Sequence, residues 1–216
     1  MRIDFNSSRV ITCPFCFEKK YFMNCLSCND VGARYWSDGK RNGPMLPEMS
    51  NVQKCSRCGK YYLRSRQQEQ EVDDFNVSDD EPLTYQELKE AFVQLSAEGF
   101  DEEGEEEADI RFMLHYAHND YYHREEKRPV SEEESKFFRD NALWLIRYAI
   151  DKDILKVEFY REIGEFEMAQ KCLDIMQDTR FLWEDFANEI ERRIKEKDSE
   201  VFFVSRHKDR RRWQRQ

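Results

Sequence analysis

Six of the seven cysteines occur in three pairs, and each pair has two residues between its cysteines. The pairs are Cys13-Pro-Phe-Cys16, Cys25-Leu-Ser-Cys28 and Cys55-Ser-Arg-Cys58. With this spacing one tight turn directs two sulfurs at the same ion, and two such turns supply the four sulfurs that zinc prefers. The start, Met1-Arg-Ile-Asp-Phe5, has no apolar signal core, so we expect a reducing, cytoplasmic location in which paired cysteines bind metal rather than form disulfides.

The three pairs leave more than one set of zinc ligands open. We favour a single zinc ion held by the outer pairs, Cys13, Cys16, Cys55 and Cys58. In a second arrangement Cys25 and Cys28 replace one outer pair. In a third they bind a second ion together with His115 and His118, which stand three positions apart on a predicted helix and share a face. Ordinary packing is the simpler interpretation of both histidines, and the remaining alternatives are redox use or no metal.

Turn and strand signals surround the outer cysteine pairs. Gly59 permits the positive φ that closes a cysteine turn, and Pro14 fixes φ in the first turn. Residues 33–40 contain Asp38-Gly39, a strong two-residue hairpin signal, and Lys60-Tyr61-Tyr62-Leu63 is typical of a short strand. These features predict an N-terminal zinc ribbon over residues 1–66, with the 33–40 hairpin as part of it.

Zinc in such a ribbon is first of all a folding device. The segment has few Leu, Ile or Val residues, so it buries too little apolar surface to fold alone. Structural zinc supplies on the order of 10 kcal/mol to a small domain. Four thiolates leave no coordination position for water, which argues against hydrolytic catalysis at this ion.

Charge divides the chain into three segments. Residues 1–66 carry 12 Lys/Arg against 5 Asp/Glu, residues 67–136 carry 6 against 23, and residues 137–216 carry 17 of each. This division predicts a basic metal-binding module, an acidic linker over residues 67–82 and a separate body. No run of about 18 apolar residues is present to cross a membrane, so we expect no membrane partner.

Helical periodicity begins after the linker. Thr84-Tyr-Gln-Glu87 is a capping box, and Ser131-Glu-Glu-Glu134 is a second one. The predicted helices span residues 84–99, 109–122, 131–150, 153–163, 166–177 and 180–197, with residues 101–108 as a charged loop. They predict an antiparallel helical domain over residues 83–200, followed by a basic tail over 201–216. The predicted fold class is therefore α+β and predominantly α.

The helix pair on either side of Gly164 resembles one tetratricopeptide repeat. Tyr160, Gly164, Phe166 and Ala169 occupy matching positions, whereas the earlier aromatic and glycine positions of the repeat's first helix are absent. An ordinary helical hairpin is an equally good interpretation. Cys172 lies beside apolar residues and is predicted to be a core residue.

The chain as a whole resembles a group of uncharacterised bacterial proteins that have an N-terminal zinc ribbon and a C-terminal tetratricopeptide-like helical domain. The resembling segments include Cys13-Pro-Phe-Cys16, Gly32-Ala-Arg-Tyr-Trp-Ser-Asp-Gly-Lys40, Cys55-Ser-Arg-Cys58-Gly59, Ile110-Arg-Phe-Met-Leu-His-Tyr-Ala-His-Asn-Asp120 and Phe159-Tyr-Arg-Glu-Ile-Gly-Glu-Phe166. The resemblance implies an architecture but gives no information about activity. In that group the middle cysteine pair is not a standard feature, which supports the outer four as ligands.

Two binding functions follow from this architecture. In the first, the protein is a non-catalytic adaptor whose helical body binds another protein, because arrays of helical hairpins expose grooves that accept peptides or helices. In the second, it binds nucleic acid through the basic ribbon and the C-terminal tail. The tail residues that would contact phosphates and bases are Arg206, Lys208, Arg210, Arg211, Arg212 and Trp213.

Catalysis is the third possibility, and no known catalytic motif is present. The densest polar cluster is His118-Asn119-Asp120 followed by His123, which together with Asp38 and Lys40 can be imagined as a site. A helix terminus and a hairpin turn are the simpler interpretation of these residues. We therefore expect that the protein is not an enzyme.

Overall fold

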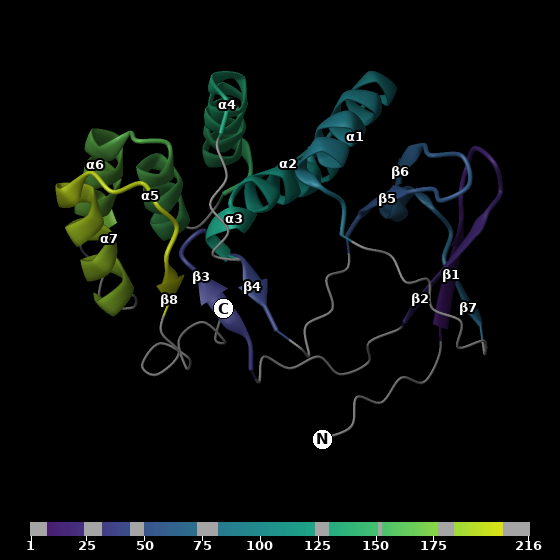
Figure 1. Ribbon diagram of the computed structural model, residues 1–216, viewed down its shortest axis with the longest axis horizontal. Coiled ribbons are helices and arrows are strands. Elements are labelled where there is room, and N and C mark those ends of the chain that lie inside the picture. The colour runs from purple at the N-terminus through teal and green to yellow at the C-terminus, as the bar shows by residue number, and fades with distance from the viewer. Residues whose placement is uncertain are drawn as a thin grey trace. The chain divides into compact units, whose positions relative to one another are not determined.

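The computed structural model describes residues 8–23, 32–43, 50–72, 82–123, 130–150, 153–176 and 184–204 (Figure 1). The fold is α+β and predominantly α, with small antiparallel sheets and a set of helices. The chain forms two compact units. The ribbon unit contains residues 1–33 and 43–113, and the helical unit contains residues 34–42 and 114–216. No helix among the described residues is long and apolar enough to cross a membrane.

Two small sheets form the β part of the ribbon unit. Strand β1 (Ser8–Thr12) lies between β2 (Lys19–Met23) and β7 (Gln70–Val72), and both pairings are antiparallel. The other sheet pairs β5 (Val52–Lys54) with β6 (Tyr61–Leu63), and the 3-10 helix η1 (Arg64–Arg66) follows β6.

Strand β7 lies inside the segment predicted to be an acidic linker, residues 67–82. Its residues pair with the second edge of β1, so that Val10 faces both Tyr21 and Gln70. Residues 70–72 therefore belong to the ribbon sheet. The reason is that β1 has two edges of backbone hydrogen-bonding groups, and β2 covers only one of them.

Helix α1 (Tyr85–Glu98) also belongs to the ribbon unit. It begins with the predicted capping box, in which the Glu87 N–H donates to Thr84 Oγ1 and the Thr84 N–H donates to Glu87 Oε2. The Gln94 side chain bonds the backbone of Tyr61 on β6, accepting from its N–H at 3.2 Å and donating to its carbonyl at 2.7 Å. These bonds attach α1 to the ribbon sheets and explain why it does not belong to the helical unit.

Helix α2 (Glu105–His118) begins earlier than the predicted residue 109. The Asp101 carboxylate accepts from the Glu106 N–H, while the Glu106 carboxylate accepts from the Asp101 N–H, both at 3.1 Å. Acidic side chains are also favoured at the positive end of a helix. Residues 105–108, predicted as part of a charged loop, are therefore the first turn of α2. The boundary between the two units falls between Met113 and Leu114, and the one-turn helix α3 (Asp120–His123) follows.

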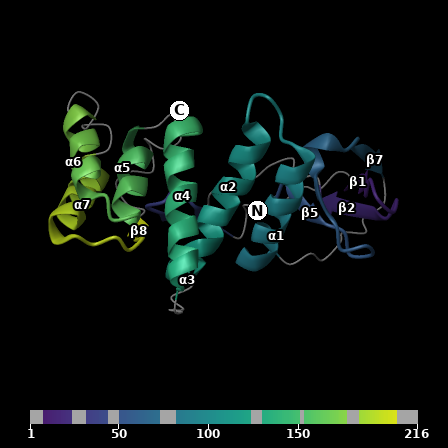
Figure 2. The ribbon, with the colours of Figure 1, turned by 90° about the horizontal axis from the view of Figure 1, so that it is seen from above.

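Four longer helices make most of the helical unit: α4 (Glu132–Tyr148), α5 (Asp153–Glu162), α6 (Phe166–Ile175) and α7 (Glu184–Glu196). Helix α5 packs against α4, α6 and α7, and Figure 2 shows α4, α5 and α6 in succession. The core contains Ile154, Val157, Ala169, Leu173 and Ile190, and the half-buried Cys172 packs against it as predicted.

The predicted hairpin is present, but it belongs to the helical unit and not to the ribbon. Strand β3 (Arg34–Trp36) pairs with β4 (Arg41–Asn42), and Gly39 makes the turn with φ +89°. The other edge of β3 pairs with β8 (Phe203–Val204), and the Ser37 N–H donates to the Phe202 carbonyl at 2.9 Å. Residues 201–204, predicted as the start of the tail, are therefore part of the packed fold.

Candidate metal centre and buried polar cluster

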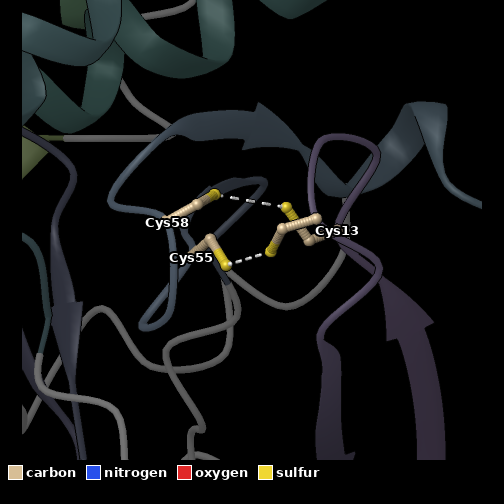
Figure 3. Close-up of side chains that lie close together, drawn as sticks. Cys13, Cys55 and Cys58 are labelled. Carbon is tan, nitrogen blue, oxygen red and sulfur yellow. Dashed lines mark hydrogen bonds between the residues drawn. The ribbon is translucent and has the colours of Figure 1, made fainter.

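The four cysteines of the outer pairs lie close together. Their Sγ atoms are all within 4.8 Å of one another; the Cys13–Cys58 and Cys16–Cys55 distances are 3.8 and 3.5 Å (Figure 3). A tetrahedral zinc ion with Zn–S bonds of about 2.3 Å places its sulfurs about 3.8 Å apart, whereas a disulfide needs about 2 Å. Each of the four is a free thiol, and the cluster has the size and chemistry to hold a metal ion such as zinc.

Two turns with the same backbone hydrogen bonds carry these cysteines. In the first knuckle (residues 13–17) the Cys13 N–H donates to the Glu18 carbonyl and the Phe17 N–H donates to the Cys13 carbonyl. In the second knuckle (residues 55–59) the Cys55 N–H donates to the Lys60 carbonyl and the Gly59 N–H donates to the Cys55 carbonyl. Gly59 has φ +72°, as its position predicts, and Phe17 at the equivalent position has φ +61°.

Burial and crowding of the sulfurs perturb the ionisation of Cys13, Cys16 and Cys55. Burial raises the pKa of the Cys13 thiol. The backbone N–H of Glu18 favours the Cys16 thiolate, but burial and the neighbouring thiols raise its pKa to about 12. Burial also opposes ionisation of Cys55, yet the backbone N–H groups of Cys58 and Arg57 and two nearby thiols lower its pKa to about 7. Four thiolates at these distances repel one another, so a divalent cation is the natural partner of the fully ionised set.

A hydrophobic shell surrounds half of the cysteine cluster. Cys13 and Cys55 are buried with Ile11 and Tyr62, whereas Cys58 is exposed at the surface. With four sulfurs around it, an ion here has no open coordination position, so the site suits structural rather than catalytic zinc. Cys25 and Cys28 lie outside the described residues, and the alternatives that use them stay predictions.

The polar residues that the sequence singled out next to the hairpin form a buried cluster in the helical unit. His123 bridges two aspartates: Nε2 lies 3.0 Å from Asp38 Oδ2, and Nδ1 lies 3.1 Å from Asp120 Oδ1. Lys40 Nζ donates to Asp120 Oδ1 at 2.6 Å, and Asn119 Nδ2 donates to Asp38 Oδ2 at 3.1 Å. The structure therefore brings together Asp38, Lys40, Asn119, Asp120 and His123.

Charge pairing dominates the ionisation of this cluster. Burial alone would raise the pKa of Asp38, but the hydrogen bond and positive charge of His123 lower it. Burial likewise disfavours the imidazolium of His123, but its hydrogen bonds to Asp120 and Asp38 outweigh this effect and raise the pKa of His123. The two carboxylates thus favour the imidazolium form of His123, and His123 favours the ionised form of each aspartate.

The two histidines considered as alternative zinc ligands pack inside the helical unit. The ring of His115 is fully buried and stacks on Phe159 with centroids 3.9 Å apart, and its Nε2 lies 2.9 Å from Glu162 Oε2. His118 Nδ1 lies 3.1 Å from Glu134 Oε1. Both positions agree with the simpler interpretation of these residues as packing residues.

Two notable residues were missed by the sequence analysis. Glu162 on α5 is buried and accepts a hydrogen bond from Asn119 at 2.9 Å, and burial raises its pKa. The available signal was that Glu158, Arg161 and Glu162 continue the helical face begun by Ile154, where apolar residues are expected. The positive φ of Phe17 was not predicted, because a phenylalanine in the sequence gives no indication that its backbone position suits glycine.

Comparisons of the chain with models of known protein families, with curated proteins and with solved structures found no match. The cysteine cluster, the small hairpins and the helices agree with the coarse architecture inferred from the sequence. The tetratricopeptide-like character of α5 and α6 and the likeness to a bacterial group stay predictions.

Proposed function

We propose that this protein is a non-catalytic, zinc-stabilised adaptor that binds another protein through its helical unit. The four-cysteine cluster supports one structural zinc ion in the ribbon unit, held by Cys13, Cys16, Cys55 and Cys58. Zinc in that role fixes a small fold and leaves recognition to the surrounding surfaces.

The observation that carries the adaptor function is an apolar stripe on α6. Met168 and Ile175 stand two helical turns apart on the same face, and their exposed fractions are 38% and 83%. The neighbouring face of α6 supplies Ala169, Leu173 and Met176 to the core. Helix α6 is thus apolar on a second, solvent-facing stripe, which is the pattern by which one helix accepts an amphipathic partner helix.

The contacts of the buried polar cluster favour a structural role and support the non-catalytic assignment. Both nitrogens of His123 are engaged by carboxylates, and Asp38 is fully buried. A general base needs a nitrogen or oxygen within reach of a substrate proton. In this cluster the acidic and basic groups face one another.

A double variant, Met168→Asp with Ile175→Asp, tests the adaptor function. The tagged full-length protein is used to capture partners from its native host at high salt, and the bound proteins are identified. We expect a partner held in a salt-resistant manner by the wild type and lost by the double variant, because charges in an apolar contact are costly. Glu167→Gln is the control, since it changes the charge of an exposed α6 position that lies about 100° from Met168 around the helix axis. Retention of the partner by the double variant would refute the adaptor surface.

Nucleic-acid binding is the second candidate function, and a specific feature of the ribbon favours it. The described residues 8–23 and 50–63 carry six Lys/Arg against one acidic residue, and they expose aromatic rings. The predicted tail contacts, from Arg206 to Trp213, lie outside the described residues. Nucleic acid that copurifies with the protein and is removed by high salt is the expected sign of this function.

A further inference from the structure

Phe17 has a left-handed backbone conformation that glycine adopts more easily, so the fold does not need a phenylalanine at this position. Its φ of +61° matches the +72° of Gly59, and the two residues make the same backbone hydrogen bond to the first cysteine of their knuckles. Residues other than glycine and asparagine are strained in this left-handed region. The second knuckle shows that glycine closes the same turn without that strain.

Burial does not compensate for the strain at Phe17. Its side chain is 78% exposed, the largest exposure of any phenylalanine among the described residues, and Phe15 on the same knuckle is 39% exposed. The ribbon core uses Ile11, Tyr62 and the half-buried Phe22 instead. The strained, solvent-exposed ring of Phe17 does not stabilise the ribbon unit, which indicates that it contacts another molecule.

Positive charge surrounds the two aromatic rings. Lys60 Nζ lies 4.5 Å from the centroid of the Phe15 ring. Arg57 is exposed on the second knuckle, and its 3.4 Å contact with Glu18 is a weak surface ion pair. In the parts of the chain that the structure describes, neither Lys19 nor Lys60 forms an ion pair. Cations and exposed aromatic rings thus share one end of the ribbon, where the thiols bring the two knuckles together.

We propose that the two knuckles bind single-stranded nucleic acid, with the Phe17 ring stacked on one base and Lys60 and Arg57 at the phosphates. Aromatic rings stack on any base face, and a positive surface follows the backbone. Bases in a duplex are already stacked on their neighbours, so a protruding ring favours unpaired strands. This inference rests on the second candidate function, gives it a site, and is independent of the α6 stripe.

Binding of labelled oligonucleotides to the full-length, zinc-loaded protein tests the proposal. The probes are fluorescein-labelled thymidine and uridine oligonucleotides of about 20 residues and a duplex of the same length, and binding is followed by anisotropy. The key variant is Phe17→Gly, which removes the ring and relieves the backbone. We expect its dissociation constant for single strands to rise roughly tenfold, in line with the loss of one stacked base, with zinc content unchanged and the melting temperature equal or higher.

Two further variants separate stacking from charge and from folding. Lys60→Gln should weaken binding and reduce its salt dependence between about 50 and 200 mM salt, because it removes one phosphate contact. Tyr148→Ala removes an exposed aromatic ring from α4, beside Arg147, and is the matched control that should leave binding unchanged.

The outcomes distinguish the site from the function. Normal single-strand binding by Phe17→Gly would overturn the knuckle site while leaving nucleic-acid binding in place. A wild-type protein that binds no oligonucleotide at low salt would overturn both. A protein partner held at high salt and lost in Phe17→Gly would make the knuckles a protein-docking surface and refute the nucleic-acid proposal.

Discussion

The thiol of Cys55 ionises at a pKa of about 7, since backbone N–H groups and neighbouring thiols outweigh its burial. We expect Cys55→Ser to reduce the zinc content from one ion per chain to none and to unfold the ribbon unit, because zinc supplies on the order of 10 kcal/mol. Zinc is measured by mass spectrometry of metals on protein purified without chelator. Cys172→Ser is the control, and it should keep the ion because Cys172 packs on the helical core.

The middle cysteine pair is tested by a second variant. Because the outer four thiols already supply a tetrahedral set, we expect Cys25→Ser with Cys28→Ser to keep one zinc ion per chain. The same metal measurement applies. A fall from two ions to one would show instead that Cys25 and Cys28 hold a second ion.

His123 gives the helical unit a pH dependence with a definite sign. Its pKa is raised in the folded state, so its contribution to stability is complete below the unfolded pKa of about 6.5 and is lost as pH rises through the folded pKa. Asp38 has a lowered pKa, so its contribution is present above about pH 4 and is lost as pH falls through its folded value. The combined contribution of His123 and Asp38 is therefore highest between these limits.

Substitution of His123 should remove the loss of stability that its deprotonation causes at alkaline pH. In His123→Gln the amide still hydrogen-bonds, but no proton is released at alkaline pH, so we expect a lower maximum and a flatter decline in melting temperature. Thermal unfolding followed by circular dichroism across the pH range measures both effects. If the melting temperature of the variant declined at alkaline pH as steeply as that of the wild type, a group other than His123 would be the cause.

At the scale of a single helix, a buried ion pair stabilises α5. Arg161 binds the Glu158 carboxylate with two nitrogens, and its Nη2 also donates to the Glu200 carbonyl at 3.0 Å. We expect Arg161→Met to lower the free energy of unfolding by about 3 to 5 kcal/mol, because the Glu158 carboxylate is left buried and unpaired. The double variant Glu158→Leu with Arg161→Met should be less destabilised.

Helix α7 offers a matched control for the α5 pair. Glu189 and Arg192 have the same three-residue spacing and the same two-nitrogen contact, but they lie at the surface. Arg192→Met should therefore cost less than about 1 kcal/mol. Urea unfolding measures all of these variants. Equal costs for Arg161→Met and Arg192→Met would show that burial does not strengthen the α5 pair.

Elements with local signals were predicted well from the sequence. The capping boxes at Thr84 and Ser131 each start a helix, and Gly164, with φ +76°, separates α5 from α6. Apart from the start of α2, the errors concern pairings between distant residues. Nothing local in Gln70–Val72 indicates pairing with β1, and nothing local in residues 201–204 indicates pairing with β3. Register and partner depend on which strand edges are free, and a single sequence does not contain that information.

The two candidate sites also differ in how much of each can be predicted from local sequence. Cysteine spacing predicted the cluster, because two residues between thiols fix the geometry of each knuckle. The buried polar cluster combines residues from the hairpin, α3 and α5 with Asn119, which lies between α2 and α3, so its members were only partly found. Asp38 was recognised as a turn residue, whereas the contact of Glu162 with Asn119 depends on how α5 packs.

At the scale of the whole molecule, all four clustered cysteines lie in the ribbon unit. We expect a strong chelator to raise amide exchange around Ile11 and Tyr62 much more than around Val157 and Ile190 in the helical core. Hydrogen–deuterium exchange measured by mass spectrometry, with and without chelator, compares the two units. Equal increases in both would show that the helical unit depends on the metal as well.

Strand β3 is synthesised long before its neighbour β8. Ser37 and Phe202, which exchange hydrogen bonds in the finished fold, are 165 positions apart. During translation this edge of β3 must therefore stay exposed until residues 203–204 have emerged. A nascent chain halted before residue 201 would carry a strand with one unpaired edge, and holdase chaperones should recognise it at that stage.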